Sequence, residues 1–273
     1  PGGVLASDLQ VQTVISKQIN LLVGGANGSV LFWDGTGLVG NGAIQGGNGS
    51  WDAASTNWTT VNGTGNRDWS SNFAVFQAAA GDVLVNGTQS ITGLQFVTDG
   101  YVLVAGTNGA LNAINSSSGS FAVRVDPNVT AQLELPINGN ATLAKLDTGT
   151  LVLNGANGYT GGTRLTGGTL VVGNDSALGG GVLTAAGGTT LDSNQAVSLA
   201  NDVNLLGRLR IGGSNALTLG GDISGNGGLL KANAGTLTLN GGGGTGVTQT
   251  AGNLSATGLT TLLYGSKTGN FTY

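Results

Sequence analysis

Residues 149–173 read Gly149-Thr-Leu-Val-Leu-Asn-Gly-Ala-Asn-Gly-Tyr-Thr-Gly-Gly-Thr-Arg-Leu-Thr-Gly-Gly-Thr-Leu-Val-Val-Gly173, and this stretch decides the fold. Short apolar runs are interrupted by Gly, Asn or Thr, which leaves no room for a helix. Leu151 and Leu153 are two positions apart, as are Leu170 and Val172, and at this spacing strand side chains share one face. We expect short strands with these side chains in the interior and with Val152 and Val171 pointing outward.

The same design returns later in the chain at a fixed offset. Residues 141–155 align with residues 227–241 at an offset of 86 positions, so that Leu151 and Leu153 correspond to Leu237 and Leu239. An internal repeat of fixed period is typical of a solenoid. If the offset holds four coils of three short strands, each coil has about 21 residues and the chain forms roughly thirteen coils. The sequence therefore predicts an all-β, three-faced parallel β-helix.

The composition agrees with a solenoid and argues against several functions. The chain has 53 glycines, 3 prolines and 8% charged residues. Gly and Asn tolerate the positive φ angles of tight corners, so the glycine content fits a chain that turns every few residues. A net charge of −4 without any Lys/Arg cluster argues against binding to nucleic acid or to an anionic membrane. No apolar run is long enough to span a membrane.

The aromatic residues divide the chain into two regions. All four tryptophans lie in the first part, separated by Gly- and Asn-rich insertions, whereas regular apolar pairs begin near Val83. We expect residues 1–80 to form an entry region with long loops and residues 81–273 to form regular coils. The tryptophans either cap the end of the hydrophobic column, which we favour, or bind a ligand such as a sugar through their ring faces. They are Trp33, Trp51, Trp58 and Trp69.

The sequence gives little evidence for a catalytic, cofactor or metal site. The chain has no His and no Cys, which removes the commonest general base and any thiolate chemistry. Residues 35–40 match Gly-x-Gly-x-x-Gly, but the Gly-rich residues that follow cannot form the helix of a dinucleotide site. The acidic residues are isolated, although Asp202 and Asp222 are about one coil apart. We predict no enzyme activity, cofactor or metal site; the alternative is a polysaccharide-active β-helix enzyme whose acids converge from neighbouring coils.

Two stretches resemble a known family. Residues 149–163 match the pattern Gly-Thr-Leu-x-Leu-x-Gly-x-Asn-x-Tyr-Thr-Gly-Gly-Thr of the passenger-associated transport repeat, found in bacterial autotransporter passenger domains. The second copy lacks the Asn-x-Tyr-Thr-Gly-Gly part, and the opening Phe32-Trp-Asp-Gly35 with the later tryptophans resembles the first segment of many passengers. The motif residues of the two copies are Gly149, Leu151, Leu153, Asn154, Asn157, Tyr159, Gly161, Gly162, Leu170, Gly235, Leu237, Leu239 and Asn240.

The resemblance implies a fold and a function. It implies a right-handed parallel β-helix that is exported by a type V route and displayed on, or released from, a Gram-negative cell surface. The expected role is that of a stalk, an adhesive module or a self-associating module. The expected partners are another copy, joined end to end or laterally, or glycans of a host or bacterial surface. The chain after residue 268 is too short for the family's membrane barrel, so we expect a passenger fragment, a released passenger or a secreted relative.

Overall fold

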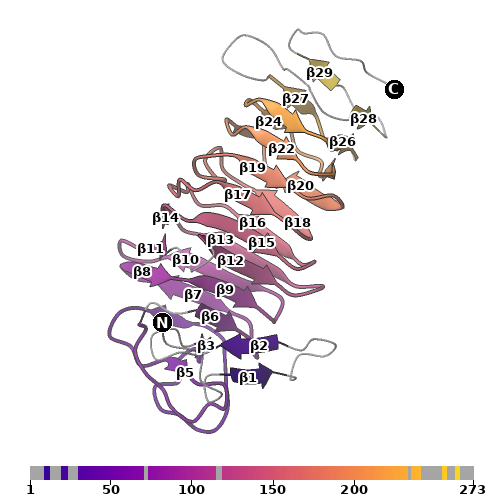
Figure 1. Cartoon of the computed structure of the whole chain (residues 1–273). Coiled ribbons are helices and arrows are strands. Elements are labelled where there is room, and N and C mark those ends of the chain that lie inside the picture. Colours follow the sequence, from indigo (N-terminus) through magenta and orange to yellow (C-terminus); the bar gives the residue numbers. More distant parts are fainter. Residues whose placement is uncertain are drawn as a thin grey trace.

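A computed structural model describes residues 9–12, 20–23, 30–70, 73–114, 119–232, 235–240, 254–256 and 262–264. Within these ranges every regular element is a β-strand, and the strands stack along one axis from the indigo end to the yellow end of Figure 1. Consecutive strands turn at corners of a few residues, where Gly and Asn adopt positive φ, for example Gly168 at 67° and Asn128 at 64°. The chain therefore winds as a parallel β-solenoid.

The strands belong to three faces. Face one is a ten-stranded sheet made of β4 (Gly49–Trp51), β7 (Asp82–Val85), β10 (Tyr101–Ala105), β13 (Thr130–Glu134), β16 (Thr150–Leu153), β18 (Thr169–Val172), β20 (Thr189–Ser193), β23 (Arg208–Ile211), β26 (Gly228–Lys231) and β28 (Leu254–Ala256). Face two is a second ten-stranded sheet made of β5 (Trp58–Thr59), β3 (Val30–Trp33), β6 (Phe73–Phe76), β9 (Gly93–Phe96), β12 (Ser120–Val125), β15 (Thr142–Leu146), β17 (Thr163–Leu165), β19 (Leu183–Ala185), β22 (Val203–Leu205) and β25 (Ile223–Gly225).

Face three is divided into two shorter sheets. The first consists of β8 (Thr88–Ile91), β11 (Ala110–Ala113) and β14 (Ile137–Gly139), and the second of β21 (Val197–Leu199), β24 (Leu217–Leu219), β27 (Leu237–Leu239) and β29 (Leu262–Tyr264). A separate antiparallel pair is formed by β1 (Leu9–Gln12) and β2 (Asn20–Val23). On the three faces the strands pair in parallel, except that β3 and β5 pair antiparallel. The predicted three-faced parallel β-helix is confirmed.

The coils are slightly shorter and fewer than the sequence predicted. Asp82 pairs with Val102, and Thr130 pairs with Thr150, which places successive turns about 20 residues apart rather than 21. The described residues form about eight turns of this length, whereas the sequence predicted roughly thirteen for the whole chain. Two long steps account for much of the difference, because Gly49 pairs with Val83 and Tyr101 with Ala131. Both coils contain long loops, and the residues in these loops were counted as additional coils when roughly thirteen coils were predicted from the sequence.

The 86-residue offset is not a whole number of coils. Leu151 and Leu153 lie in β16 on face one, whereas their counterparts Leu237 and Leu239 lie in β27 on face three. With coils of about 20 residues, the offset contains four coils and one further step from face to face. The prediction of four coils is wrong because the motif encodes one strand and its corner, and an apolar pair with a Gly corner suits any of the three faces.

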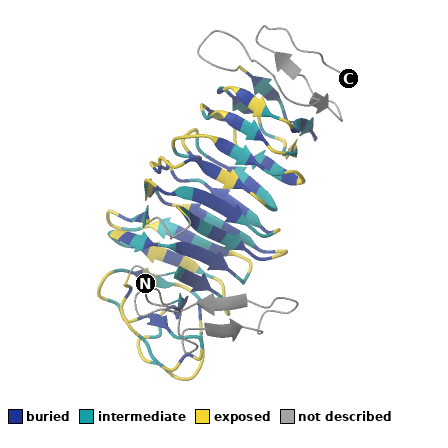
Figure 2. Ribbon diagram, in the orientation of Figure 1, coloured by how far each residue is buried: buried dark blue, intermediate teal, exposed yellow. Residues whose placement is uncertain are grey.

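The interior is a continuous apolar column. Leu151, Leu170 and Leu191 are direct partners on successive strands of face one, and all three are fully buried. The expected interior residues are buried, namely Leu151, Leu153, Leu170, Val172, Leu237 and Leu239. Figure 2 shows this burial as a dark blue band along the strands. Val171 is half-buried, as expected for an outward residue, but Val152 is only 7% exposed although it alternates with the interior leucines.

Candidate functional site

The four tryptophans gather inside the first coils. Trp33, Trp51 and Trp58 come from β3, β4 and β5 and are fully buried, and Trp69, from the loop before β6, is 7% exposed. The ring centroids of Trp58 lie 4.8 Å from Trp51, 4.4 Å from Trp69 and 5.2 Å from Trp33. These edge-on and tilted contacts are the favourable geometries for aromatic pairs. Because the rings cover one another, no indole face is open to a sugar, and this burial favours the cap over the ligand site.

The aromatic cluster continues into the leucine column. The rings of Phe76 and Phe96 stack with centroids 4.9 Å apart and an interplanar angle of 12°. Tyr101 meets Phe76 edge-on at 5.4 Å and donates its hydroxyl hydrogen bond to the carbonyl oxygen of Gln77 at 2.8 Å. Burial raises the pKa of the Tyr101 hydroxyl to about 12. Large rings thus fill the interior of the first coils, and Leu and Val fill the regular coils.

Two indole N–H groups have partners and two do not. Trp33 Nε1 donates to the carbonyl oxygen of Gly47, and Trp69 Nε1 donates to that of Ser90, both at 2.8 Å. Trp51 Nε1 and Trp58 Nε1 are buried without a hydrogen-bond partner among the described residues. A buried donor that lacks a partner destabilises the folded state.

This difference predicts unequal losses of stability for the same conservative change. Trp69→Phe is expected to lower the free energy of unfolding by about 1–3 kcal/mol, because it leaves the Ser90 carbonyl without its donor. Trp51→Phe removes an unpaired N–H, so we expect a smaller loss despite its deeper burial. Urea unfolding of both variants at an unchanged m-value measures the difference. A larger loss for Trp51→Phe would show that its indole N–H has a partner in solution.

A buried carboxylate organises the loops at this end. Asp34 is fully buried after β3, and its two oxygens accept from the backbone N–H of Gln45 at 2.7 Å and from Asn66 Nδ2 at 2.9 Å. Asn66 Nδ2 also donates to the carbonyl oxygen of Gly37 at 2.9 Å. The residues of the Gly-x-Gly-x-x-Gly match, 35–40, form turn and loop without a helix. Their glycines serve the close packing of this loop.

The transport-repeat residues that carry side chains act as structural ties. Asn157 is buried; its Oδ1 accepts from the backbone N–H of Ile137 at 2.8 Å, and its Nδ2 donates to the carbonyl oxygen of Ala177 at 2.6 Å. One side chain therefore links three successive coils. The hydroxyls of Tyr159 and Thr163 are 2.6 Å apart in the interior, and burial raises the pKa of Tyr159. The motif builds a corner of the solenoid where face three has no strand.

A polar row runs along the corner that follows face one. Asn194 Nδ2 donates to Asn154 Oδ1 at 2.9 Å, passing over Gly173, and Asn154 Nδ2 approaches Glu134 Oε1 at 3.4 Å. A Cβ on Gly173 would lie 2.1 Å from Asn154 Oδ1, so a larger residue there would displace the Asn154 side chain. Together with Gln195, these residues line an open groove of about 470 Å³. Its lining consists of hydrogen-bonding groups and contains no aromatic ring.

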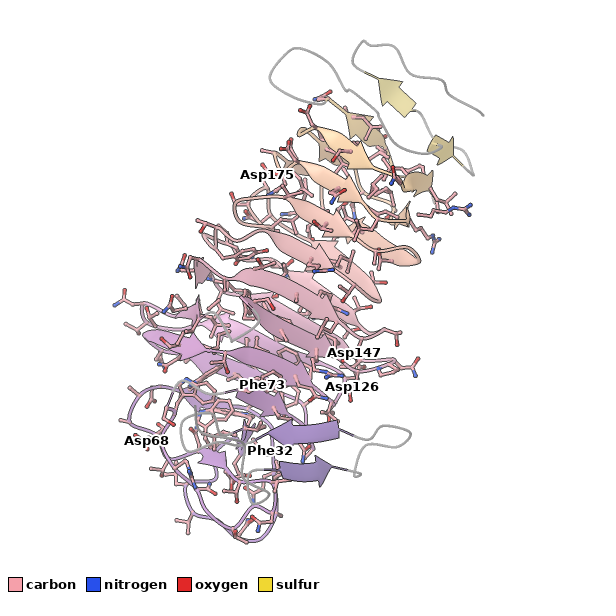
Figure 3. All side chains as sticks on the ribbon, in the orientation of Figure 1. Phe32, Asp68, Phe73, Asp126, Asp147 and Asp175 are labelled. Atoms are coloured by element: carbon pink, nitrogen blue, oxygen red, sulfur yellow. The ribbon has the colours of Figure 1, made fainter. Side chains whose placement is uncertain are left out.

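The charged residues of face two form a second cluster. Arg124 makes a two-point ion pair with Asp147, at 2.9 Å from Nε and 3.1 Å from Nη2, and Gln95 donates to Asp126 at 3.0 Å. Figure 3 shows Asp126 and Asp147 near each other on neighbouring coils. Burial is the main reason that the pKa of Asp126 is raised, and its Oδ2 has no partner among the described residues. The Gln95 amide and the Arg124 guanidinium thus donate hydrogen bonds to these two carboxylates, which do not face each other across an open groove.

Lys145 points into the interior, which the sequence analysis did not anticipate. Its direct partners on face two, Val123 and Leu165, are interior residues, and the lysine itself is fully buried. Its ammonium donates to the carbonyl oxygens of Leu146, Asp147 and Gly167 at 2.8, 2.9 and 3.2 Å. Burial lowers the pKa of Lys145 to about 8, although the Asp147 charge opposes the shift. The sequence did contain a signal for this inward orientation, because Lys145 follows Leu143 at a spacing of two, at which strand side chains share one face.

This buried amine predicts a stability change above neutral pH. The pKa of Lys145 is about 8 in the folded state and about 10.4 in the unfolded state. Between these values the unfolded chain binds more protons, so folding stability rises with pH in this window. We expect a rise of about 1–3 kcal/mol from pH 8 to pH 10, and a smaller one in Lys145→Met. Chemical denaturation at each pH measures it, and equal slopes in the two proteins would contradict the assignment.

Two acidic residues of the later coils, Asp175 and Asp202, accept hydrogen bonds from backbone groups of the next coil. Asp202 and Asp222 do lie on neighbouring coils, but Asp202 Oδ1 accepts from the backbone N–H of Asp222 at 2.8 Å rather than facing its carboxylate. Asp175 Oδ1 accepts similarly from the backbone N–H of Ser198 at 2.7 Å. In the described part of the chain, no three His, Cys, Asp or Glu side chains are grouped as metal ligands would be. Over the same residues, no helix has the length and apolar character to cross a membrane.

The fold and its corners define a repeat solenoid, and sequence comparisons show which known proteins it resembles. Residues 143–172 match the passenger-associated transport repeat. The chain is also 37% identical over 256 residues to the adhesin BmaC autotransporter of Brucella suis biovar 1, an alignment that covers 86% of this chain and 7% of that protein. No solved structure matches the chain. The resemblance to autotransporter passenger domains is confirmed, and the repeat and the relative indicate an exported, cell-surface protein of a Gram-negative bacterium.

Proposed function

We propose that this chain is a β-helical passenger segment with a structural and adhesive role at the cell surface. The observation that carries the proposal is the unbroken interior column, which joins parallel strands about 20 residues apart into one elongated body. A solenoid of this kind keeps its outer loops in fixed positions along an axis. The adhesin relative supports the adhesive part, although the chain spans only 7% of its length.

The distribution of polar groups supports a role without catalysis. The buried or partly buried side chains of Asp34, Asn157 and Lys145 bond to backbone groups and so serve the coils themselves. The acids of face two are engaged by Gln95 and Arg124. Hydrolysis of a polysaccharide would need an acid and a base that converge in an open groove. The groove at the polar row contains one carboxylate, that of Glu134, among its lining residues.

The two expected regions form part of this proposal. Residues 34–70 contain long loops between short strands, and from β7 onward most coils advance by about 20 residues. We propose that residues 1–80 cap the column through the tryptophan cluster and that residues 81–273 act as the regular stalk. The part of the stalk beyond residue 240 lies largely outside the described residues.

Adhesion is tested by coating the purified chain on beads and counting the beads that bind to epithelial monolayers. We expect more bound beads than with albumin or with heat-unfolded chain at the same surface density. Equal binding of all three would remove the adhesive role and leave the stalk. Sedimentation velocity on the same preparation tests self-association, for which we expect a concentration-dependent sedimentation coefficient.

Binding to surface glycans is a second candidate, favoured by the polar groove. Amide groups both donate to and accept from hydroxyl groups, the Glu134 carboxylate accepts from them, and the row is held in place by its own hydrogen bonds. Asn194→Ala removes one lining side chain from an exposed corner. If glycans are the partner, this change reduces bead binding, whereas Asn112→Ala on the outer side of β11 leaves it unchanged.

A further inference from the structure

The most exposed large apolar side chains lie together on one loop. Leu38 is 57% exposed and Val39 is 78% exposed, and both belong to the loop between β3 and β4, at the indigo end in Figure 1. Isolated exposed leucines are ordinary on protein surfaces. Two adjacent ones at the tip of a loop that the structure holds rigidly are not explained by the packing of the solenoid.

Four hydrogen bonds hold the loop between β3 and β4 in place. The Asp34 carbonyl oxygen accepts from the backbone N–H of Gly37 at 2.8 Å, Asn66 Nδ2 holds the Gly37 carbonyl oxygen, and Thr56 Oγ1 donates to the Leu38 carbonyl oxygen at 3.1 Å. The neighbouring loop is joined to it, because the backbone N–H of Gly42 donates to the carbonyl oxygen of Gly63 at 3.0 Å. A rigid loop loses little conformational entropy when a partner covers it.

The surroundings of the tip indicate the chemistry of the partner. Residues 35–66 contain a single charged side chain, the acidic Asp52, whose carboxylate accepts hydrogen bonds from the backbone N–H groups of Ala54 and Ser55. A polyanionic glycan or an anionic lipid surface would require basic residues near the contact. Two aliphatic side chains also provide much less apolar area than one myristoyl chain, which by itself gives only marginal membrane binding. An apolar pocket on a protein encloses such side chains on several sides and adds contacts around them.

We propose that Leu38 and Val39 form a preorganised contact that inserts into an apolar pocket of a protein on the target cell. The proposal rests on the adhesive role proposed above and assigns that role to a particular loop. The Gly-rich neighbours of the tip allow the partner surface to approach the backbone closely. The rest of the two loops is polar and carries only the charge of Asp52, as protein interfaces place apolar anchors inside a polar border.

The test compares three chains in the bead-adhesion assay. The double variant Leu38→Ser/Val39→Ser is expected to lower the apparent affinity for epithelial cells at least tenfold, because full burial of one aliphatic side chain is worth about a factor of ten or more. Leu206→Ser is the matched control, since Leu206 is 55% exposed on a distant corner between β22 and β23. Its affinity should equal that of the unchanged chain. Thermal unfolding should be the same for all three, because the changed side chains are exposed.

A second arm identifies the class of partner. Mild protease treatment of the target cells should abolish binding of the unchanged chain, whereas periodate oxidation of surface glycans should not. Equal adhesion of the double variant and the unchanged chain would overturn the loop assignment while leaving the adhesive role intact. Protease-resistant, periodate-sensitive binding would overturn the protein partner in favour of a glycan. Absence of adhesion by the unchanged chain would overturn both proposals.

Discussion

Trp58→Ala is expected to lower the free energy of unfolding by about 3–5 kcal/mol, because truncation of a fully buried ring leaves a large cavity. The Trp58 ring touches three other indoles and lies 5.7 Å from Phe76. No single neighbour can move into the space without losing its own contacts. We also expect the near-ultraviolet circular dichroism of the protein to fall, since it depends on the fixed geometry of the aromatic cluster.

A second aromatic residue provides the comparison. Phe73 lies in β6, where it is half-buried and covers Gly93 on the neighbouring strand, and Figure 3 labels it. Phe73→Ala removes a smaller ring from a partly solvated position, so we expect a smaller loss of stability than for Trp58→Ala. Denaturant unfolding of both variants measures the two losses. Equal losses would mean that the indole cluster is loosely packed in solution and does not act as a cap.

The second large effect concerns the paired glycines of the transport repeat. A Cβ on Gly161 would lie 2.5 Å from the backbone carbon of Ala141, and Gly162 has φ +83° with the Val182 carbonyl oxygen 2.7 Å from its Cβ position. Both obstacles are backbone atoms of neighbouring coils, which cannot rotate away. Gly161→Ala/Gly162→Ala is therefore expected to lower the free energy of unfolding by about 2–6 kcal/mol.

The chain contains a matched pair for this experiment. Gly188 has φ +80°, nearly the same as Gly162, but no atom lies within 4 Å of its Cβ position, and the nearest atom to that of Gly187 is at 3.4 Å. Gly187→Ala/Gly188→Ala keeps the backbone strain and omits the clash, so we expect a loss of only about 1–2 kcal/mol. Thermal and urea unfolding of the two double variants separates these contributions. Similar losses would assign the requirement to φ alone.

The sequence determined the architecture well because a solenoid is built from local signals. Apolar pairs at a spacing of two, such as Leu151 and Leu153, define both the strand and its interior face, and each is repeated on the next coil. The face on which a motif lies could not be predicted, because the signal is the same for all three faces. Only the pairing partners reveal that Leu237 and Leu239 belong to face three.

Residues whose roles depend on contacts far along the chain were harder to predict. Asp34 bonds to Asn66, 32 positions away, and Asn194 bonds to Asn154, 40 positions away. Neither pair has a sequence signature, because the loops that join Asp34 to Asn66 follow no repeat period, and because Asn154 and Asn194 meet across an intervening coil where Gly173 leaves room for their side chains. Lys145 was overlooked for another reason: a charged side chain is normally read as outward, although its amine reaches three carbonyl oxygens of two successive corners.

The 86-residue offset contains four coils and one further step from face one to face three, and this extra step has a consequence for how such genes change length. Recombination between the two copies of the motif would delete the intervening chain and join Leu151 of the first copy to the residues that follow Leu237 in the second. The junction would preserve every local rule of strand and corner, so the product should still fold. Because four coils and one face are removed together, everything beyond the junction would be turned by about a third of a revolution about the axis. Exchange between repeats would then redirect the outer loops of the downstream coils as well as shorten the rod.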